Sequence, residues 1–145
     1  MDYVLLAKVR KKREMMKVYG AVGLGGVLGS CLRYLFSLVM SSNNFTSFPW
    51  ATLVVNISGT FLLPFILFLP MIKRKVNPVI LVALTTGLIG SYTTFSTITV
   101  EIVMMFHENI LVAIGYLIST LIGGLLFSWL GYQTALFVQK GGSSI

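Results

Sequence analysis

The sequence is short of charged residues, and this shortage decides its class. Only 10% of its 145 residues are Asp, Glu, Lys or Arg, whereas 56% are hydrophobic. Soluble domains carry roughly a quarter charged residues. The composition therefore excludes a soluble protein and indicates an integral membrane protein, and the length allows one small bundle.

Residue types that build enzyme and metal sites are scarce as well. The chain has one cysteine, Cys31, and one histidine, His107, so an internal disulfide is excluded and a histidine–cysteine metal cluster is not expected. The sequence contains no Ser/His/Asp set, no H-E-x-x-H motif and no phosphate-binding loop. We therefore expect a protein that is not an enzyme.

Four apolar segments are each long enough to cross a bilayer, which takes about 20 residues. A basic flank, residues 1–17, precedes them, and a short polar tail, residues 139–145, follows and is expected to be frayed. The expected fold is an all-α membrane protein with one four-helix domain over residues 18–138. Its spans are expected at about 18–40, 50–71, 78–105 and 110–138.

The positive charge is gathered on one side of this layout. Ten of the eleven Lys and Arg residues lie in 8–17, in 73–75 or at Lys140, and the other is Arg33 within the first span. The positive-inside rule then places both termini in the cytoplasm. The net charge of +7 is thus a signal of orientation and of contact with anionic lipid headgroups, and no nucleic-acid partner is expected.

The third span has a polar middle. Residues 87–101, GLIGSYTTFSTITVE, contain two glycines and seven hydroxyl side chains. Such groups are tolerated at mid-membrane depth where they face protein or a wet cavity, and broken helices mark ion sites in transport proteins. The alternative is a glycine-kinked helix whose hydroxyls bond to their own carbonyls, and this segment alone does not separate the two.

Three other polar residues lie within spans. Asn56 shares a helical face with Thr52 and Thr60, and its amide either bonds a partner helix or donates to an anion. Arg33 is either a structural anchor at the headgroups or a charge that attracts anions. Glu101, the only acid in a span, is expected to meet a hydroxyl or a helix N-terminus.

Motifs in three spans together resemble the Fluc (CrcB) family of fluoride channels. They are GGVLGSCLRYLFS in the first span, TLVVNISGTFLL in the second, and GLIGSYTTFST followed by Glu101 in the third. The resemblance covers the whole four-helix layout. It implies an antiparallel, dual-topology dimer in the plasma membrane, with passive fluoride-selective pores along the subunit interface that lower cytoplasmic fluoride.

The resemblance also implies roles for individual residues. The backbone carbonyls of Gly90 and Thr93 would hold a structural, non-transported sodium ion at the dimer interface, where the third helix is broken. Arg33 would match the family arginine near the vestibule, and Glu101 would be a further vestibule or structural charge. The fluoride pore would be lined by Asn56, Phe95, Ser96, Thr97, Ile98, Tyr116 and Thr120.

The chain departs from the family pattern at Ile98, where the family usually has a second phenylalanine whose ring edge helps to coordinate fluoride. Isoleucine has no polarised edge, so a pore that relies on this position should be impaired. The strong charge bias also predicts a single insertion direction, whereas a dual-topology homodimer needs a weak bias. We therefore expect a heterodimer with a homologous, oppositely oriented subunit, with a homodimer as the alternative.

Two other functions remain open from the sequence. A small four-helix drug exporter of the dual-topology kind would depend on a membrane-embedded carboxylate, for which Glu101 is the available residue. A non-conducting partner subunit is the other, and Ile98 is its main support.

Overall fold

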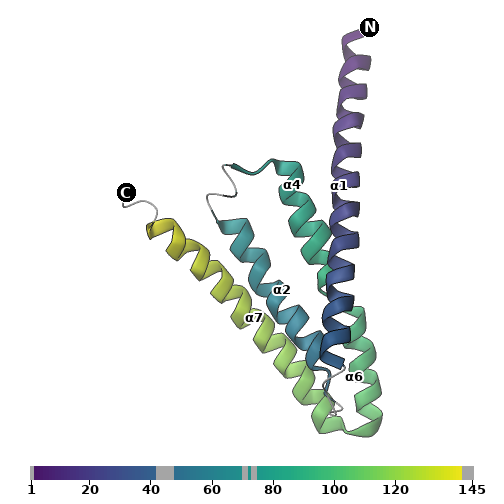
Figure 1. The fold of residues 1–145 in the computed structure, drawn as a ribbon, viewed down its shortest axis with the longest axis vertical. Coiled ribbons are helices and arrows are strands. Elements are labelled where there is room, and N and C mark those ends of the chain that lie inside the picture. Colours follow the sequence, from purple (N-terminus) through teal and green to yellow (C-terminus); the bar gives the residue numbers. More distant parts are fainter. Residues whose placement is uncertain (1, 42–47, 70–71, 73–74, 142–145) are drawn as a thin grey trace.

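A computed structural model describes residues 2–41, 48–69, 72 and 75–141, and within these residues every regular element is a helix. Four helical segments are long and apolar enough to cross a membrane, which confirms the expected all-α, four-span fold. Both chain ends and the connection from the second span to the third lie at one end of the bundle (Figure 1). The four segments are Lys12–Met40, Trp50–Phe68, Pro78–Glu108 and Ile110–Lys140.

The first helix, α1 (Asp2–Ser41), is a single helix of 40 residues. It begins well before the expected start of the first span at residue 18, so the basic flank is a helical extension of that span. At ~1.5 Å per residue, a helix of this length reaches ~60 Å, about twice the hydrocarbon thickness of a bilayer. Its N-terminal part accordingly projects beyond the other helices (Figure 1).

The second and fourth spans are continuous helices. Helix α2 (Trp50–Phe68) passes through Pro64 and ends slightly before the expected boundary at residue 71. Helix α7 (Ile110–Gly141) continues past the expected boundary at residue 138. The first residues of the expected tail are therefore helical, and residues 142–145 lie outside the described part of the chain.

The third span is broken, as expected. It consists of α4 (Pro78–Val82), a π-helix η1 (Ala83–Ile89), the short α5 (Gly90–Tyr92) and, after residues 93–95, α6 (Ser96–Glu108). Asn77 caps its start, since the side chain accepts a hydrogen bond from the Val79 N–H at 2.9 Å, and Pro78 suits the first helical position.

The break changes the neighbours of the third span. Before the break, η1 and α5 pack against α1, whereas after it α6 packs against α7, which also packs along α2 (Figure 1). Glycines of α1 make this contact close: a Cβ added to Gly29 would collide with the Leu88 carbonyl oxygen, and one added to Gly25 with that of Ala83. Only glycine allows the two backbones to come this close.

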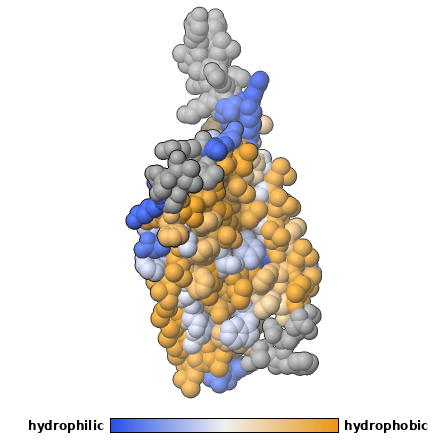
Figure 2. Space-filling view, turned by 60° about the vertical axis from the view of Figure 1, so that its left-hand side comes forward, coloured by the Kyte–Doolittle hydropathy of each residue, from blue (hydrophilic) through white to orange (hydrophobic). Residues whose placement is uncertain are grey.

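The molecule has a small core and a largely apolar exterior. Large hydrophobic side chains stay exposed along the helices, such as Leu111 at 77% and Leu125 at 75%. In Figure 2 the helices present a mostly hydrophobic surface, with strongly hydrophilic residues towards the two ends of the molecule. Such a surface suits a lipid environment. The buried cluster consists of Leu53, Ile98, Met105, Ala113 and Tyr116.

Candidate functional site: the helix break and its cavities

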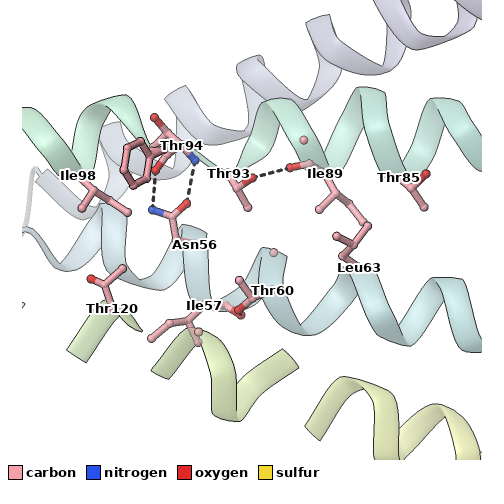
Figure 3. Close-up of a pocket in the computed structure, with 14 residues that line it drawn as sticks. Asn56, Ile57, Thr60, Leu63, Thr85, Ile89, Thr93, Thr94, Ile98 and Thr120 are labelled. Atoms are coloured by element: carbon pink, nitrogen blue, oxygen red, sulfur yellow. Dashed lines mark hydrogen bonds between the residues drawn. The ribbon is translucent and has the colours of Figure 1, made fainter. Parts of the chain in front are cut away.

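Asn56 of α2 holds the break in the third span. Its Oδ1 accepts a hydrogen bond from the Thr94 N–H at 2.8 Å, and its Nδ2 donates to the Thr94 carbonyl at 3.0 Å (Figure 3). Both residues are buried, where an unpaired peptide group is costly. One side-chain amide thus pairs both the N–H and the carbonyl of Thr94, two backbone groups that the broken helix does not pair.

The Thr94 hydroxyl starts the next helix. It accepts a hydrogen bond from the Thr97 N–H at 3.2 Å and lies 2.9 Å from the Thr97 hydroxyl and 3.3 Å from that of Ser96. A threonine oxygen that bonds an N–H in the first turn is the usual way to cap a helix start. The backbone N–H of Thr94 thus leaves the helical pattern to bond Asn56, and the Thr94 hydroxyl caps the first turn of α6.

Two of these hydrogen bonds, from the Thr94 N–H and from the Thr97 N–H, take donors away from the carbonyls of Gly90 and Thr93. In a continuous α-helix, the N–H groups of Thr94 and Thr97 would donate to those carbonyls. Here they donate to Asn56 and to the Thr94 hydroxyl instead. Gly90 and Thr93 thus lose their helical donors, and carbonyl oxygens of this kind suit a hard cation such as sodium.

An open cavity of about 290 Å³ lies beside the break, between α2, the third span and α7. Its walls combine apolar side chains with a few hydroxyls and the Asn56 amide (Figure 3). The structure brings six of the residues singled out in the sequence to this one cavity. They are Asn56, Gly90, Thr93, Phe95, Ile98 and Thr120.

Phe95 and Ile98 lie very differently although they are three residues apart. The Phe95 side chain is 83% exposed, whereas Ile98 is 8% exposed and packs into the core beside Leu53 and Tyr116. Phe95 has the largest exposed fraction among the large hydrophobic side chains that the structure describes, and it lies directly beside the break. Phe95 thus extends out of its own bundle, while Ile98 forms part of the cavity wall.

A second, smaller cavity of about 180 Å³ surrounds Arg33. Ser30 and Ser37 of α1, Thr52 of α2 and Thr97 of α6 also line it. Within the described chain, no carboxylate lies within ion-pair distance of the Arg33 guanidinium. A cation without an acidic partner, among hydroxyl groups, makes this cavity suitable for an anion.

Glu101 has the hydroxyl partners that the sequence led us to expect. Its carboxylate accepts hydrogen bonds from the Thr52 hydroxyl at 2.6 Å and from the Tyr116 hydroxyl at 2.7 Å. The Tyr116 side chain is completely buried. The three side chains tie α2, α6 and α7 together.

The seven expected pore residues do not form one track within a single chain. Asn56, Phe95, Ile98 and Thr120 line the larger cavity, and Thr97 lines the smaller one with Arg33. Tyr116 and Ser96 line neither cavity. Tyr116 bonds Glu101, and Ser96 is exposed, with its hydroxyl 3.3 Å from that of Thr94.

Three further residues shape the site but had no role in our sequence assignment: Thr52, Gly59 and Thr94. A Cβ on Gly59 would collide with the Thr93 methyl group, so this glycine lets α2 approach the break. Thr52 lies one turn before Asn56 on the same helical face, and Gly59 belongs to the V-N-x-x-G motif. Those patterns could have identified both residues, whereas the capping role of Thr94 depends on where the break falls.

Comparison with known proteins places the chain in a family. Residues 20–132 match the family described as CrcB-like protein, Camphor Resistance (CrcB). The chain is 41% identical over 128 residues to the fluoride-specific ion channel FluC 2 of Geobacillus kaustophilus, a match that covers 86% of this chain and 98% of the relative. It is 37% identical over 115 residues to the fluoride-specific ion channel FluC 1 of Desulfitobacterium hafniense, covering 79% and 99%. Because this similarity extends from the first span into the fourth, the chain belongs to the CrcB family.

Proposed function

We propose that this chain forms a passive, fluoride-selective channel that lets fluoride leave the cytoplasm across the plasma membrane. Family membership supports this function, because the relatives carry the name fluoride-specific ion channel. The observation that carries it in this chain is the broken third helix, held by Asn56 beside a cavity at the middle of the bundle. A passive channel performs no chemical reaction, which fits the lack of a catalytic set.

The cavity offers donors that could replace the water around a small anion. Asn56 uses one of its two Nδ2 hydrogens for the Thr94 carbonyl, so the second can donate to an ion. The positively polarised edge of the Phe95 ring is a further weak donor. We assign the approach of the anion to the Arg33 cavity, whose positive charge raises the local anion concentration.

We further propose a structural sodium ion at the carbonyls of Gly90 and Thr93, shared with the same pair of a second subunit. The support is the diversion of the Thr94 and Thr97 N–H groups, which takes the helical donors from those carbonyls. When bound, the ion would supply a fixed positive charge near the anion path. In this chain, Asn56 and Thr94 keep the carbonyls available.

A second subunit is proposed because the break is poorly covered. Non-helical backbone at membrane depth must be buried in protein or line a water-filled cavity. Phe95 is 83% exposed and the adjoining cavity is open, so an antiparallel homologous subunit would cover both. Phe95 of each subunit would then complete the pore of the other.

We favour a heterodimer for two independent reasons. Ten of the eleven basic residues lie at one side of the layout, which favours one insertion direction, and Ile98 gives the cavity wall an aliphatic side chain where the family has a ring. Ile98 also supports the second candidate function, a subunit whose own pore does not conduct. Cross-linking tests the pairing: antiparallel links between identical chains, with full fluoride flux from the chain alone, would overturn the heterodimer.

Growth of fluoride-sensitive bacteria tests the function in cells. Cells that lack their own exporter should grow on fluoride when they express this chain together with a homologous, oppositely biased partner. The same pair with Asn56→Asp should not restore growth. Failure of the unaltered pair, with both proteins found in the membrane, would contradict the proposal.

A further inference from the structure

An aromatic cluster closes the end of the bundle opposite the chain termini. Phe48 lies in the connection just before α2, and its ring centroid is 4.5 Å from that of Trp50 and 5.4 Å from that of Tyr116. The contact with Tyr116 is edge to face, with an angle of 85° between the rings. Phe48 therefore packs from outside onto the tyrosine that bonds Glu101.

The Tyr116 hydroxyl oxygen lies on the axis about which its ring turns, so it shifts only when the whole side chain swings about χ1. That hydroxyl donates to Glu101 Oε2 at 2.7 Å, while Thr52 donates to Oε1 at 2.6 Å. Edge-to-face aromatic contacts have a preferred orientation, so the Phe48 ring opposes a swing of the Tyr116 side chain away from Glu101. The hydrogen bond to Glu101 thus depends on a residue that does not touch the carboxylate.

A pocket close to Phe48 along the chain reaches Glu101. A pocket of about 240 Å³ at this end is lined by Glu101, Glu108 and Pro49, the residue that follows Phe48. Removal of the Phe48 ring would let water compete for the Glu101 carboxylate. Competing water would weaken the hydrogen bond from Tyr116 to Glu101, because an exposed carboxylate can bond water instead.

We propose that Phe48 is a positioning residue for fluoride permeation. Its ring holds Tyr116 so that the tyrosine hydroxyl stays on Glu101, and the carboxylate in turn stays fixed between α2 and α7. This inference rests on the proposed channel function, and it adds a residue outside the four spans to the machinery. Phe48 acts through Tyr116 and contacts no ion itself.

A double-mutant comparison tests this inference, using Phe48→Ala, Tyr116→Phe and the combination in the channel with its partner. Tyr116→Phe removes the hydroxyl but keeps the ring and hence the edge-to-face contact. We expect either single change to lower fluoride efflux from liposomes about tenfold, the factor set by loss of one hydrogen bond to a charged group. In the Tyr116→Phe background, Phe48→Ala should lower efflux no further.

A merely structural role gives a different result. If Phe48 only fills space, Phe48→Ala lowers efflux and the unfolding midpoint equally in both backgrounds, and the proposal is overturned while the channel function stands. If Phe48 holds the hydroxyl, both effects are smaller in the Tyr116→Phe background. Phe106→Ala is the matched control, because that exposed phenylalanine of α6 has no ring contact within the described chain.

The unfolding measurement keeps the two proposals separate. If the unaltered channel and partner release no fluoride, the proposed function fails. The midpoints of the four proteins still decide whether Phe48 supports the Tyr116 hydroxyl. Equal midpoint shifts in the two backgrounds would then refute the role of Phe48 independently of any transport.

Discussion

Asn56 shows one of the two uses that its sequence position left open. Its polar face on α2 indicated either a bond to another helix or a donor for an anion, and the structure shows the first: the side chain bonds the N–H and the carbonyl of Thr94. This partner could not be predicted from spacing, because it is a backbone group 38 residues away that is free only where the third helix breaks. The donor role stays a prediction, supported by the second Nδ2 hydrogen.

Asn56→Asp should impair permeation severely. A carboxylate cannot donate to the Thr94 carbonyl, and its charge repels both that oxygen and a passing anion. We expect fluoride efflux to fall roughly tenfold or more, since a buried acceptor is left unpaired.

Asn109→Asp is the matched control for this change. Asn109 caps α7 through its Oδ1, which accepts from the N–H groups of Leu111 and Val112, and aspartate serves equally well at such a position. Efflux should stay unchanged in this variant. Equal efflux for Asn56→Asp and Asn109→Asp would remove Asn56 from the ion path.

Ile98 is where the sequence departs from the pattern that the family resemblance implies. The structure shows why an isoleucine fits: its side chain belongs to the core cluster and also forms part of the cavity wall. The adjoining cavity of about 290 Å³ leaves room for a larger side chain.

Ile98→Phe should raise fluoride efflux several-fold. The new ring would enter the cavity and present a polarised edge to the ion, as the family pattern does. Ile102→Phe, one turn further along α6 and outside the cavity lining, is the control and should not raise efflux. Unchanged efflux for Ile98→Phe, with the unfolding midpoint preserved, would show that Ile98 does not limit the pore.

Among the helices, the third span was predicted only in part from the sequence. The two glycines and the row of hydroxyls left a break and a kinked helix open, the family resemblance implied the break, and the break is present at residues 93–95. The π-helix at Ala83–Ile89 was not predicted, because its wider turn follows from packing against α1 and has no composition of its own. The helical nature of the basic flank was also missed, since its charges indicated orientation only.

The close approach of α1 to the third span gives a prediction for stability. Gly29→Ala should destabilise the fold by about 1–3 kcal/mol, the usual cost of overpacking, because the new methyl group would meet the Leu88 carbonyl. Chemical unfolding in detergent measures this change.

Gly23→Ala supplies the comparison within the same helix. A Cβ at Gly23 meets nothing within 4 Å, so alanine should be neutral or stabilise the helix by up to about 1 kcal/mol. Equal destabilisation by the two changes would contradict the close packing of α1 on η1.

At the scale of the whole molecule, the even number of spans predicted that both termini share one side, and the structure places them at the same end (Figure 1). The charge bias predicts that this end is cytoplasmic, and the pairing with a second subunit is likewise a prediction. Neither the orientation nor the pairing follows from the geometry of one chain, because the first depends on the membrane and the second on the partner.

The orientation is testable through the basic extension of α1. Replacing the six Lys and Arg residues of 8–17 with Gln leaves four basic residues on that side, so a fraction of molecules should insert in the opposite direction. A C-terminal reporter that is active on only one side of the membrane measures this fraction. Lys140→Gln alone should leave the orientation unchanged, and a unique orientation in both variants would refute the role of the extension.

Fluoride efflux from liposomes tests whether this chain forms a fluoride channel with its partner. Liposomes loaded with fluoride or with chloride would contain the purified chain alone, the chain with its homologous partner, or no protein. We predict rapid release of fluoride and retention of chloride with the paired chain, and weak release of fluoride from the chain alone. Fluoride release no faster than from empty liposomes in both protein samples, with the protein shown to be folded, would contradict the account.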